Sequence, residues 1–431
     1  MSVTRVLVAN RGEIAVRIIR ACQSLGIETV AAVSDADRES MAAQMANRAV
    51  CIGPPRSIDS YLKVENLIAA AQGTGCDALH PGYGFLSERA ALAQACVDNK
   101  ITFIGPSAEN ITMMGDKLEA RKIARDAGVP LVPGSDRARN PQEAALLAEQ
   151  IGYPLLLKAS AGGGGRGIKL VSSASEIEDT FRTAAAEART AFGNDTLYME
   201  KYVGNARHIE VQILGDRHGN VIHLGERDCS LQRRHQKIVE EAPAYAVSPE
   251  VRTMICNAAA KLARSIGYQS AGTIEFIYDN DTSEFYFLEM NTRIQVEHPV
   301  TEMITGVDLV QQQLRIARGE PLPFKQSDIQ FNGHAIECRI NAESPQLGFR
   351  PCPGRIVEWQ APQGPGIRLD THCYPGYFVP PYYDSLLAKL IVHAATRKDA
   401  ADQTNRALDH FHVTGIDTLV PFLKTAIADP D

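Results

Sequence analysis

Short apolar runs and amphipathic segments alternate along the first hundred residues of the chain. Apolar runs predict β-strands at 5–9, 29–33 and 102–104, with a further strand that ends at Leu79. Apolar positions at helical spacing predict helices at 14–26, 63–72 and 89–99. Strands and helices that alternate in this way indicate a parallel, Rossmann-like sheet. The first strand-to-helix turn reads Asn10-Arg11-Gly12-Glu13 and lacks the G-x-G-x-x-G spacing, so we do not expect NAD or FAD there.

The hydrophobic pattern changes further along the chain. A helix at 118–127 leads to a Pro- and Gly-containing boundary, and a compact α+β segment follows. From about residue 204 onward β patterns dominate. A chain of 431 residues is too long for one ordinary core. We therefore predict an α/β and α+β fold of three parts: a Rossmann-like domain with a helical connector at 1–131, a mobile lid domain at 132–203, and a mainly antiparallel β domain at 204–431.

Composition narrows the class of protein. Apolar residues make up 45% of the chain and the net charge is −7, which does not favour a nucleic-acid-binding protein. No apolar run reaches the length of a membrane span, and the first residues lead directly into a strand without the apolar segment of a signal peptide. The nine cysteines are scattered without a CxxC pair or zinc spacing. We expect a cytoplasmic protein without disulfides that binds neither nucleic acid nor membranes.

A glycine run lies between two predicted strands at 154–159 and 168–171 and consists of Gly162, Gly163, Gly164, Gly165 and Gly167. Backbone N–H groups of such a run can converge on phosphate oxygens, because no Cβ stands in the way. It is not a Walker A loop, since no Gly-Lys-Ser/Thr follows and the next element is predicted to be a strand. The arrangement favours a flap over a nucleotide, with Lys158 near a phosphate. A flexible surface turn is the alternative interpretation.

The strongest chemical signal is a polar row at 289–297. In an extended chain alternate residues share one face, and this groups the side chains of Glu289, Asn291, Arg293, Gln295 and Glu297. A solvated edge strand usually carries Lys, Thr and Ser, whereas this row holds carboxylates, amides and a guanidinium. A buried structural network is the alternative interpretation.

Glu275 lies on the strand before this row, at 272–278, and a polar turn at 279–283 joins the two. If the loop holds an odd number of residues, about three or five, Glu275 falls directly opposite Glu289. Two unpaired carboxylates there would repel each other, and a hard cation such as Mg²⁺ between them removes the repulsion. The spacing therefore favours a magnesium site, although an even loop would weaken that inference.

Motifs along nearly the entire chain resemble, in the right order, those of the biotin carboxylase family of the ATP-grasp superfamily. They are VLVANRGEIAVRIIRA, HPGYGFLSE, FIGP, MGDK, KASAGGGGRGI, MEKYV, RHIEVQ, ERDCSLQRRHQKIVEEAP, EMNTRIQVEHPVTEMITG and HAIECRINAE. The resemblance implies an ATP-grasp fold. It also implies a ligase that carboxylates biotin with bicarbonate by way of carboxyphosphate, the first half-reaction of a biotin-dependent carboxylase. ATP and Mg²⁺ or Mn²⁺ are the implied cofactors, and biotin is the carrier-linked substrate.

The resemblance also implies residue roles. ATP would contact Lys117, Lys158, the loop Gly162–Gly167, Glu200, Lys201, Val203, His208, Gln232, His235 and Ile277. Lys237 would meet the γ-phosphate, and the metal would bind Glu275, Glu289 and Asn291. Bicarbonate would lie against Arg293, Gln295 and the backbone of Val296, with Glu297 as the general base that deprotonates it. Arg339 would stabilise negative charge on the biotin ureido oxygen, with Tyr83 near the biotin ring.

Partners follow from the same resemblance. No Met-Lys-Met attachment motif occurs in these residues, so we expect biotin to arrive on a carrier protein or domain and a carboxyltransferase component to complete the reaction. The final acceptor stays open among acetyl-CoA, propionyl-CoA, pyruvate and other acids, with fatty acid biosynthesis as one context, and a homodimer is implied by family analogy.

Two other functions are alternatives. One is an ATP-grasp ligase that joins an acyl phosphate to an amine, against which Arg339 and the RIQVEHP row argue. The other is a nucleotide sensor without activity, which would need no general base.

Overall fold

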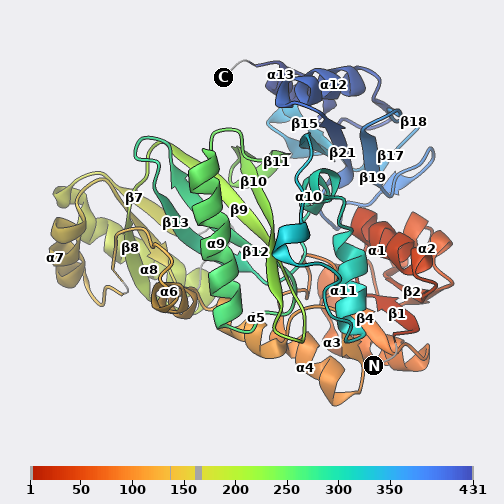
Figure 1. The fold of residues 1–431 in the computed structure, drawn as a ribbon, viewed down its shortest axis with the longest axis horizontal. Helices are drawn as coiled ribbons and strands as arrows, with labels where there is room; N and C mark the ends of the chain where they lie inside the picture. Colours follow the sequence, from red (N-terminus) through yellow and green to blue (C-terminus); the bar gives the residue numbers. More distant parts are fainter. Residues whose placement is uncertain (1–2, 136, 161–166, 430–431) are drawn as a thin grey trace.

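The computed structural model describes residues 3–135, 137–160 and 167–429 (Figure 1). Its N-terminal part is a parallel sheet in the order β3–β2–β1–β4–β5, which confirms the Rossmann-like prediction. The strands are β1 (Arg5–Val8), β2 (Glu28–Val33), β3 (Arg48–Cys51), β4 (Ala78–His80) and β5 (Thr102–Phe103). The helices among them are α1 (Gly12–Ser24), α2 (Met41–Met45), α3 (Val64–Gly73) and α4 (Ala90–Asp98). Strand β3 is not among the predicted strands; it is an edge strand that is mostly exposed, although Ala49, Val50 and Cys51 form a short apolar run.

Helices cover both faces of this sheet, because alternate strand residues point to opposite sides. Leu7 belongs to a buried cluster with residues of α3 and α4. Val6 and Val8 belong to another cluster, with residues of α1 and of α11 (Leu309–Ala317). The loops that follow β1 and β4 leave the same edge of the sheet, and both reach the cavity described below.

A second, smaller sheet has three antiparallel strands in the order β7–β6–β8. Its strands are β6 (Leu155–Ala159), β7 (Ile168–Val171) and β8 (Leu197–Lys201), and its helices are α7 (Pro141–Ile151) and α8 (Ile177–Phe192). The connecting helices α5 (Ala108–Gly115) and α6 (Lys117–Asp126) precede it. Lys158 of β6 pairs with Ile168 of β7, so the two strands form a hairpin on either side of the glycine run. Gly162, Gly163, Gly164 and Gly165 lie outside the described residues.

The largest sheet has eight antiparallel strands in the order β13–β12–β9–β10–β11–β14–β21–β19. They are β9 (Ala206–Gly215), β10 (Val221–Arg233), β11 (Gln236–Ala242), β12 (Ser270–Asp279), β13 (Phe285–Asn291), β14 (His334–Asn341), β19 (Ile367–Thr371) and β21 (Leu386–Ala394). The other helices of this part are α9 (Pro249–Ser265), α10 (His298–Thr305), α12 (Arg397–Asp409) and α13 (Val420–Ala428). Figure 1 places α9 across one face of the sheet and α12 and α13 near the C-terminus.

Shorter elements complete the fold. Two-stranded pairs join β15 (Glu343–Ser344) to β16 (Arg350–Pro351), β17 (Gly354–Arg355) to β20 (Phe378–Val379), and β18 (Glu358–Gln360) to β22 (His412–Thr414). Short 3-10 turns lie at Asp35–Asp37, Ser57–Asp59, Ala174–Glu176, Gln326–Asp328 and Pro345–Leu347. None of the described helices has both the length and the apolar character needed to cross a lipid bilayer.

The β12–β13 hairpin places Glu275 directly opposite Glu289, as predicted, but by a different route. Tyr278 pairs with Phe285, so the connection between them is 279–284, an even number of residues. That register alone would set Glu275 opposite Leu288. A β-bulge leaves Leu288 without a partner in the ladder and moves Glu289 into line with Glu275. The odd loop that was the condition for this pairing does not occur, and the bulge brings Glu275 and Glu289 opposite each other instead.

Candidate active site

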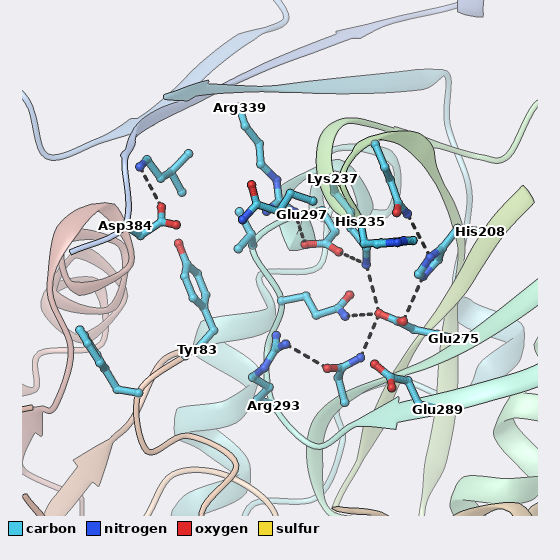
Figure 2. A pocket seen from close by; sticks show the side chains of 18 of the residues that line it. Tyr83, His208, His235, Lys237, Glu275, Glu289, Arg293, Glu297, Arg339 and Asp384 are labelled. Carbon is cyan, nitrogen blue, oxygen red and sulfur yellow. Dashed lines mark hydrogen bonds and ion pairs between the residues drawn. The ribbon is translucent and has the colours of Figure 1, made fainter. Parts of the chain in front are cut away.

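One cavity of about 620 Å³ gathers most of the predicted site residues (Figure 2). It is bounded by the largest sheet, by the β6–β7 hairpin and by the loops after β1 and β4. The predicted residues that line it are Tyr83, Lys117, Lys158, His208, Gln232, His235, Lys237, Glu275, Glu289, Asn291, Arg293, Gln295, Val296, Glu297 and Arg339. Residues that lie more than two hundred positions apart in the sequence therefore line the same cavity.

Lys237 of β11 places its ammonium group among three carboxylates, of which Figure 2 labels Glu275 and Glu297. Its Nζ lies 2.5 Å from Glu210, 3.1 Å from Glu275 and 2.6 Å from Glu297. Burial alone would lower the pKa of Lys237, but the carboxylates raise this pKa well above its usual value. The lysine therefore stays charged and is suited to bind a substrate anion.

Glu297, at the N-terminus of α10, pairs with a cation through each oxygen. Its Oε1 accepts from Lys237, and its Oε2 accepts from Arg339 Nη2 at 3.0 Å. On its other side Arg339 donates from Nε to Glu240 at 2.6 Å. Burial alone would raise the pKa of Glu297, but Lys237 and Arg339 hold it well below its usual range. Glu297 is therefore ionised, and its basicity would rise if Lys237 moved to another anion.

Glu275 and Glu289 form the part of the cavity wall suited to a cation. Oε2 of Glu275 lies 3.0 Å from His208 Nε2, and an oxygen of Glu289 lies 3.8 Å from Lys117 Nζ. Burial and the neighbouring Glu275 raise the pKa of Glu289. Burial alone would raise the pKa of Glu275, but Lys237 and His208 hold it well below its usual value, so the incompletely compensated charge lies on Glu289. Two facing carboxylates of this kind fit the oxygen ligands that Mg²⁺ prefers. Of the predicted ligands, these two fit a metal ion.

Asn291 fits that role less well. Its Nδ2 donates to Glu275 at 2.9 Å, while its Oδ1 accepts from Arg293 Nη2 at 2.9 Å. The oxygen that would bind a metal is therefore directed to Arg293. Arg293 in turn donates from Nε to Glu88 at 2.9 Å, a partner that sequence reasoning missed.

The polar row is not one extended strand. Strand β13 ends at Asn291, and the chain from 292 to 297 is irregular before α10 begins. The predicted single face therefore holds only as far as Asn291, although every predicted member of the row lines the cavity. Gln295 and Val296 are held from behind, because Gln295 Oε1 accepts from Arg227 at 3.1 Å and the Val296 carbonyl accepts from Lys389 at 2.9 Å.

Residues predicted to contact ATP divide into two groups. Lys158 lines the cavity and forms an ion pair with Glu200, which also pairs with Arg121. His208 lies 3.1 Å from Gln232, and both line the cavity. The described cavity lining does not include Glu200, Lys201, Val203, Ile277 or Gly167. Their contacts with ATP stay predictions.

Several cavity residues were not predicted. They are Asn10, Arg11, Gly12, Glu13, Ile14, Gly84, Phe85, Ala159, Ile168, Tyr198, Gln236, Leu288, Asn341, Tyr383, Asp384 and Leu386. The residues that follow β1, from Asn10 to Ile14, could have been found from their place in the sequence, since ligands of open α/β sheets bind beyond the carboxyl ends of the strands. Tyr83 donates its hydroxyl to Glu13, which follows β1. The turn after β1, where we do not expect NAD or FAD, thus still lines this cavity.

Comparison with known families agrees with this geometry. The profile "Biotin carboxylase, N-terminal domain" matches residues 2–111, "Carbamoyl-phosphate synthase L chain, ATP binding domain" matches 116–325, and "Biotin carboxylase C-terminal domain" matches 337–431. Together with lysines and paired carboxylates around one cavity, these matches define an ATP-grasp enzyme, an ATP-dependent carbon–nitrogen ligase.

Individual relatives narrow the class. Biotin carboxylase 1 of Bacillus subtilis is 53% identical over 421 residues, covering 97% of this chain and 94% of that protein. A crystal structure of Campylobacter jejuni biotin carboxylase in a β,γ-ATP complex superposes with a TM-score of 0.96 at 46% identity, covering 100% of this chain and 96% of the other. The biotin carboxylase domain dimer of Hydrogenobacter thermophilus 2-oxoglutarate carboxylase, in complex with MgADP, ADP and bicarbonate, gives a TM-score of 0.94 at 50% identity, with coverages of 99% and 94%. The chain belongs to the biotin carboxylase family. The amine ligase is therefore not favoured.

Proposed function

We propose that this chain carboxylates carrier-bound biotin with bicarbonate and ATP in the cavity described above. The observation that carries the assignment of the site is the convergence of Lys237, Glu297 and Arg339 beside the facing pair Glu275 and Glu289. Each reactant needs one of these groups: a cation for the transferring phosphoryl group, a base for bicarbonate, and a guanidinium for charge on biotin. No smaller set supports the complete half-reaction.

ATP occupies the side of the cavity nearest the β6–β7 hairpin. Lys117, Lys158 and Lys237 contact its phosphates, and His208, Gln232 and His235 hold the ribose and phosphates. Glu275 and Glu289, with Asn291 close by, would hold Mg²⁺, which would neutralise charge on the phosphates. The glycine flap closes over them, and Glu200, Lys201, Val203 and Ile277 receive the base. This closure excludes water from a labile carboxyphosphate.

Bicarbonate binds against Arg293, Gln295 and the backbone of Val296. Glu297 takes its proton, and the resulting dianion attacks the γ-phosphate to give carboxyphosphate and ADP. Carboxyphosphate breaks down to CO₂ and phosphate, the phosphate takes the N1′ proton of biotin, and N1′ attacks CO₂. Arg339 stabilises the negative charge on the ureido oxygen, with Tyr83 near the ring.

Partners and context belong to the same proposal. Biotin arrives on a carboxyl carrier protein or domain, and a carboxyltransferase component passes the carboxyl group to the final acceptor. The proposed homodimer is supported by the crystallised dimer of the Hydrogenobacter thermophilus domain. A cytoplasmic location is supported by nine free cysteines. Fatty acid biosynthesis is one metabolic context for the reaction. The proposed domains are 1–131, 132–203 and 204–431.

The test is ATP hydrolysis with Mg²⁺ and bicarbonate, with and without free biotin, for the wild type and Glu297→Gln. We expect a bicarbonate-dependent rate that biotin raises and that falls at least about a hundredfold in the variant, since general base catalysis contributes roughly that much. Glu65→Gln, at an exposed position of α3, is the control and should behave as wild type. ATP turnover that ignores bicarbonate and biotin would refute the proposal and turn attention to amine acceptors.

A further inference from the structure

Arg227 of β10 is a completely buried guanidinium that makes a hydrogen bond for each of its five N–H groups. Its relative exposure is 0%. Nε donates to Glu210 at 2.5 Å, and Nη1 donates to Gln212 at 2.8 Å and Thr301 at 2.9 Å. Nη2 donates to Thr273 at 3.2 Å and to Gln295 at 3.1 Å. Arg227 is not among the described residues that line the cavity, so it acts from behind the wall.

The contact with Gln295 fixes which end of this amide faces the reactants. A guanidinium only donates, so Arg227 must face the amide oxygen. The amide nitrogen then donates to Glu275 Oε1 at 2.9 Å, an acceptor that requires the same orientation. One further hydrogen of that nitrogen has no acceptor among the described residues, and Gln295 lines the cavity. The wall at Gln295 therefore offers a donor, which suits an anion such as bicarbonate.

The contact with Glu210 links Arg227 to Lys237, the lysine assigned to the γ-phosphate of ATP. One oxygen of Glu210 is held by Arg227 and the other by Lys237, at 2.5 Å each. Without Arg227, the buried carboxylate of Glu210 would depend on Lys237 at 2.5 Å, with His208 more distant at 3.9 Å. With Arg227 in place, the charge of Glu210 is already balanced when Lys237 turns toward a phosphate.

We propose that Arg227 is a positioning residue of the carboxylation site, which holds Gln295 with its donor toward bicarbonate and anchors Glu210 beneath Lys237. This inference rests on the proposed assignment of the bicarbonate site. It makes bicarbonate recognition depend on a residue that no reactant touches. A lysine cannot replace it, because three hydrogens on one nitrogen cannot reach acceptors spread over β9, β12, α10 and the irregular segment that holds Gln295.

The experiment measures the KM values for bicarbonate and for ATP separately in wild type, Arg227→Lys, Gln295→Ala and the double variant. For Arg227→Lys we expect the KM for bicarbonate to rise by about 10–100-fold, the range typical of lost outer-shell support. The KM for ATP should change much less, because the effect through Glu210 and Lys237 falls on the phosphoryl group during its transfer and therefore on kcat. The double variant should add little to Gln295→Ala, because the arginine acts largely through that amide. A merely structural role would lower the folded fraction without this split between the two KM values.

Arg252→Lys is the matched control, because Arg252 also pairs a guanidinium with a buried carboxylate, Glu226 at 2.5 Å, but none of its hydrogen-bond partners among the described residues lines the cavity. It should leave both KM values unchanged. If Arg227→Lys does not fold, Thr273→Val tests the same inference, since this change removes the acceptor that shares Nη2 of Arg227 with Gln295. We expect the KM for bicarbonate alone to rise by a few-fold.

Equal changes in both KM values, full additivity in the double variant, or an unchanged Thr273→Val would overturn the inference while leaving the proposed function standing. A wild type without bicarbonate-dependent turnover would refute the proposed function itself.

Discussion

Lys389→Met should destabilise the protein measurably, because it removes a cation from a fully buried ion pair. Lys389 Nζ lies 3.2 Å from Glu13 and 3.8 Å from Asp370, and it donates to the Val296 carbonyl at 2.9 Å. The side chains of Lys389 and Glu13 are 0% and 1% exposed, so water does not replace the lost interaction. Asp370 keeps Arg368 at 2.8 Å, whereas Glu13 keeps, among the residues that the structure describes, only the Tyr83 hydroxyl. The damage is therefore concentrated at Glu13.

The size of the effect follows from this difference. Breaking a buried ion pair by removing one partner costs about 3–5 kcal/mol. At about 2.1 cal/mol/K per residue, a chain of 431 residues that unfolds as one unit has an unfolding entropy near 0.9 kcal/mol/K. The expected fall in Tm is thus about 3–6 °C, and a smaller cooperative unit would shift further. Burial already raises the pKa of Glu13, so losing Lys389 should raise it again.

Scanning calorimetry of Lys389→Met and of Lys389→Met with Glu13→Gln tests this reasoning. A raised folded-state pKa gives stability at low pH that is lost as pH rises, so the deficit of the single variant should be smaller at pH 5 than at pH 8. The double variant should recover much of the loss, because the buried charge is gone. An unchanged Tm, or a double variant less stable than the single one, would refute the argument.

Three further predictions follow from other sites. Burial and the neighbouring Glu240 raise the pKa of Glu337 well above its usual value, so the wild type loses stability as the pH rises from the usual pKa toward the raised one. Glu337→Gln should therefore be the more stable form in urea at pH 8.5, and equal stability of the two forms would contradict this. Glu289→Gln should raise the Mg²⁺ concentration for half-maximal ATP hydrolysis by about 10–100-fold, with exposed Glu284→Gln as the control; an unchanged Mg²⁺ curve would exclude Glu289 as a ligand. Iodoacetamide at pH 8 should label exposed Cys51 first, since burial raises the pKa of Cys96 to about 12; equal labelling in mass spectrometry would argue for local opening.

The sequence predicts the elements better than the contacts between them. Periodicity is a local property, so it finds four of the five strands of the parallel sheet, all but β3, and the hairpin that carries Glu275 and Glu289. The bulge at Leu288 depends on how two strands pair, and no local pattern announces it. A sequence also offers no sign that Arg227 is buried, because a charged residue in a strand is usually solvated.

The residues of the candidate site also differ in how well the sequence predicts them. Motif resemblance recovers residues whose side chains enter the cavity, such as Lys237 and Arg339. It misses the residues behind them, including Glu210, Glu240 and Lys389, because their partners come from distant strands. Their importance lies in compensating buried charge, which only the three-dimensional arrangement reveals.

The continuous eight-stranded sheet has a consequence for how such a protein can be rearranged during evolution. Strand β11 pairs with β14, so the sheet passes without a break from the hairpin bearing Glu275 to the strands of the C-terminal segment. A crossover between genes that exchanged only the C-terminal segment would have to match the side chains of both strands along this seam. Recombination should therefore favour breakpoints outside 206–394, the span from β9 to β21, so that the eight strands are inherited together.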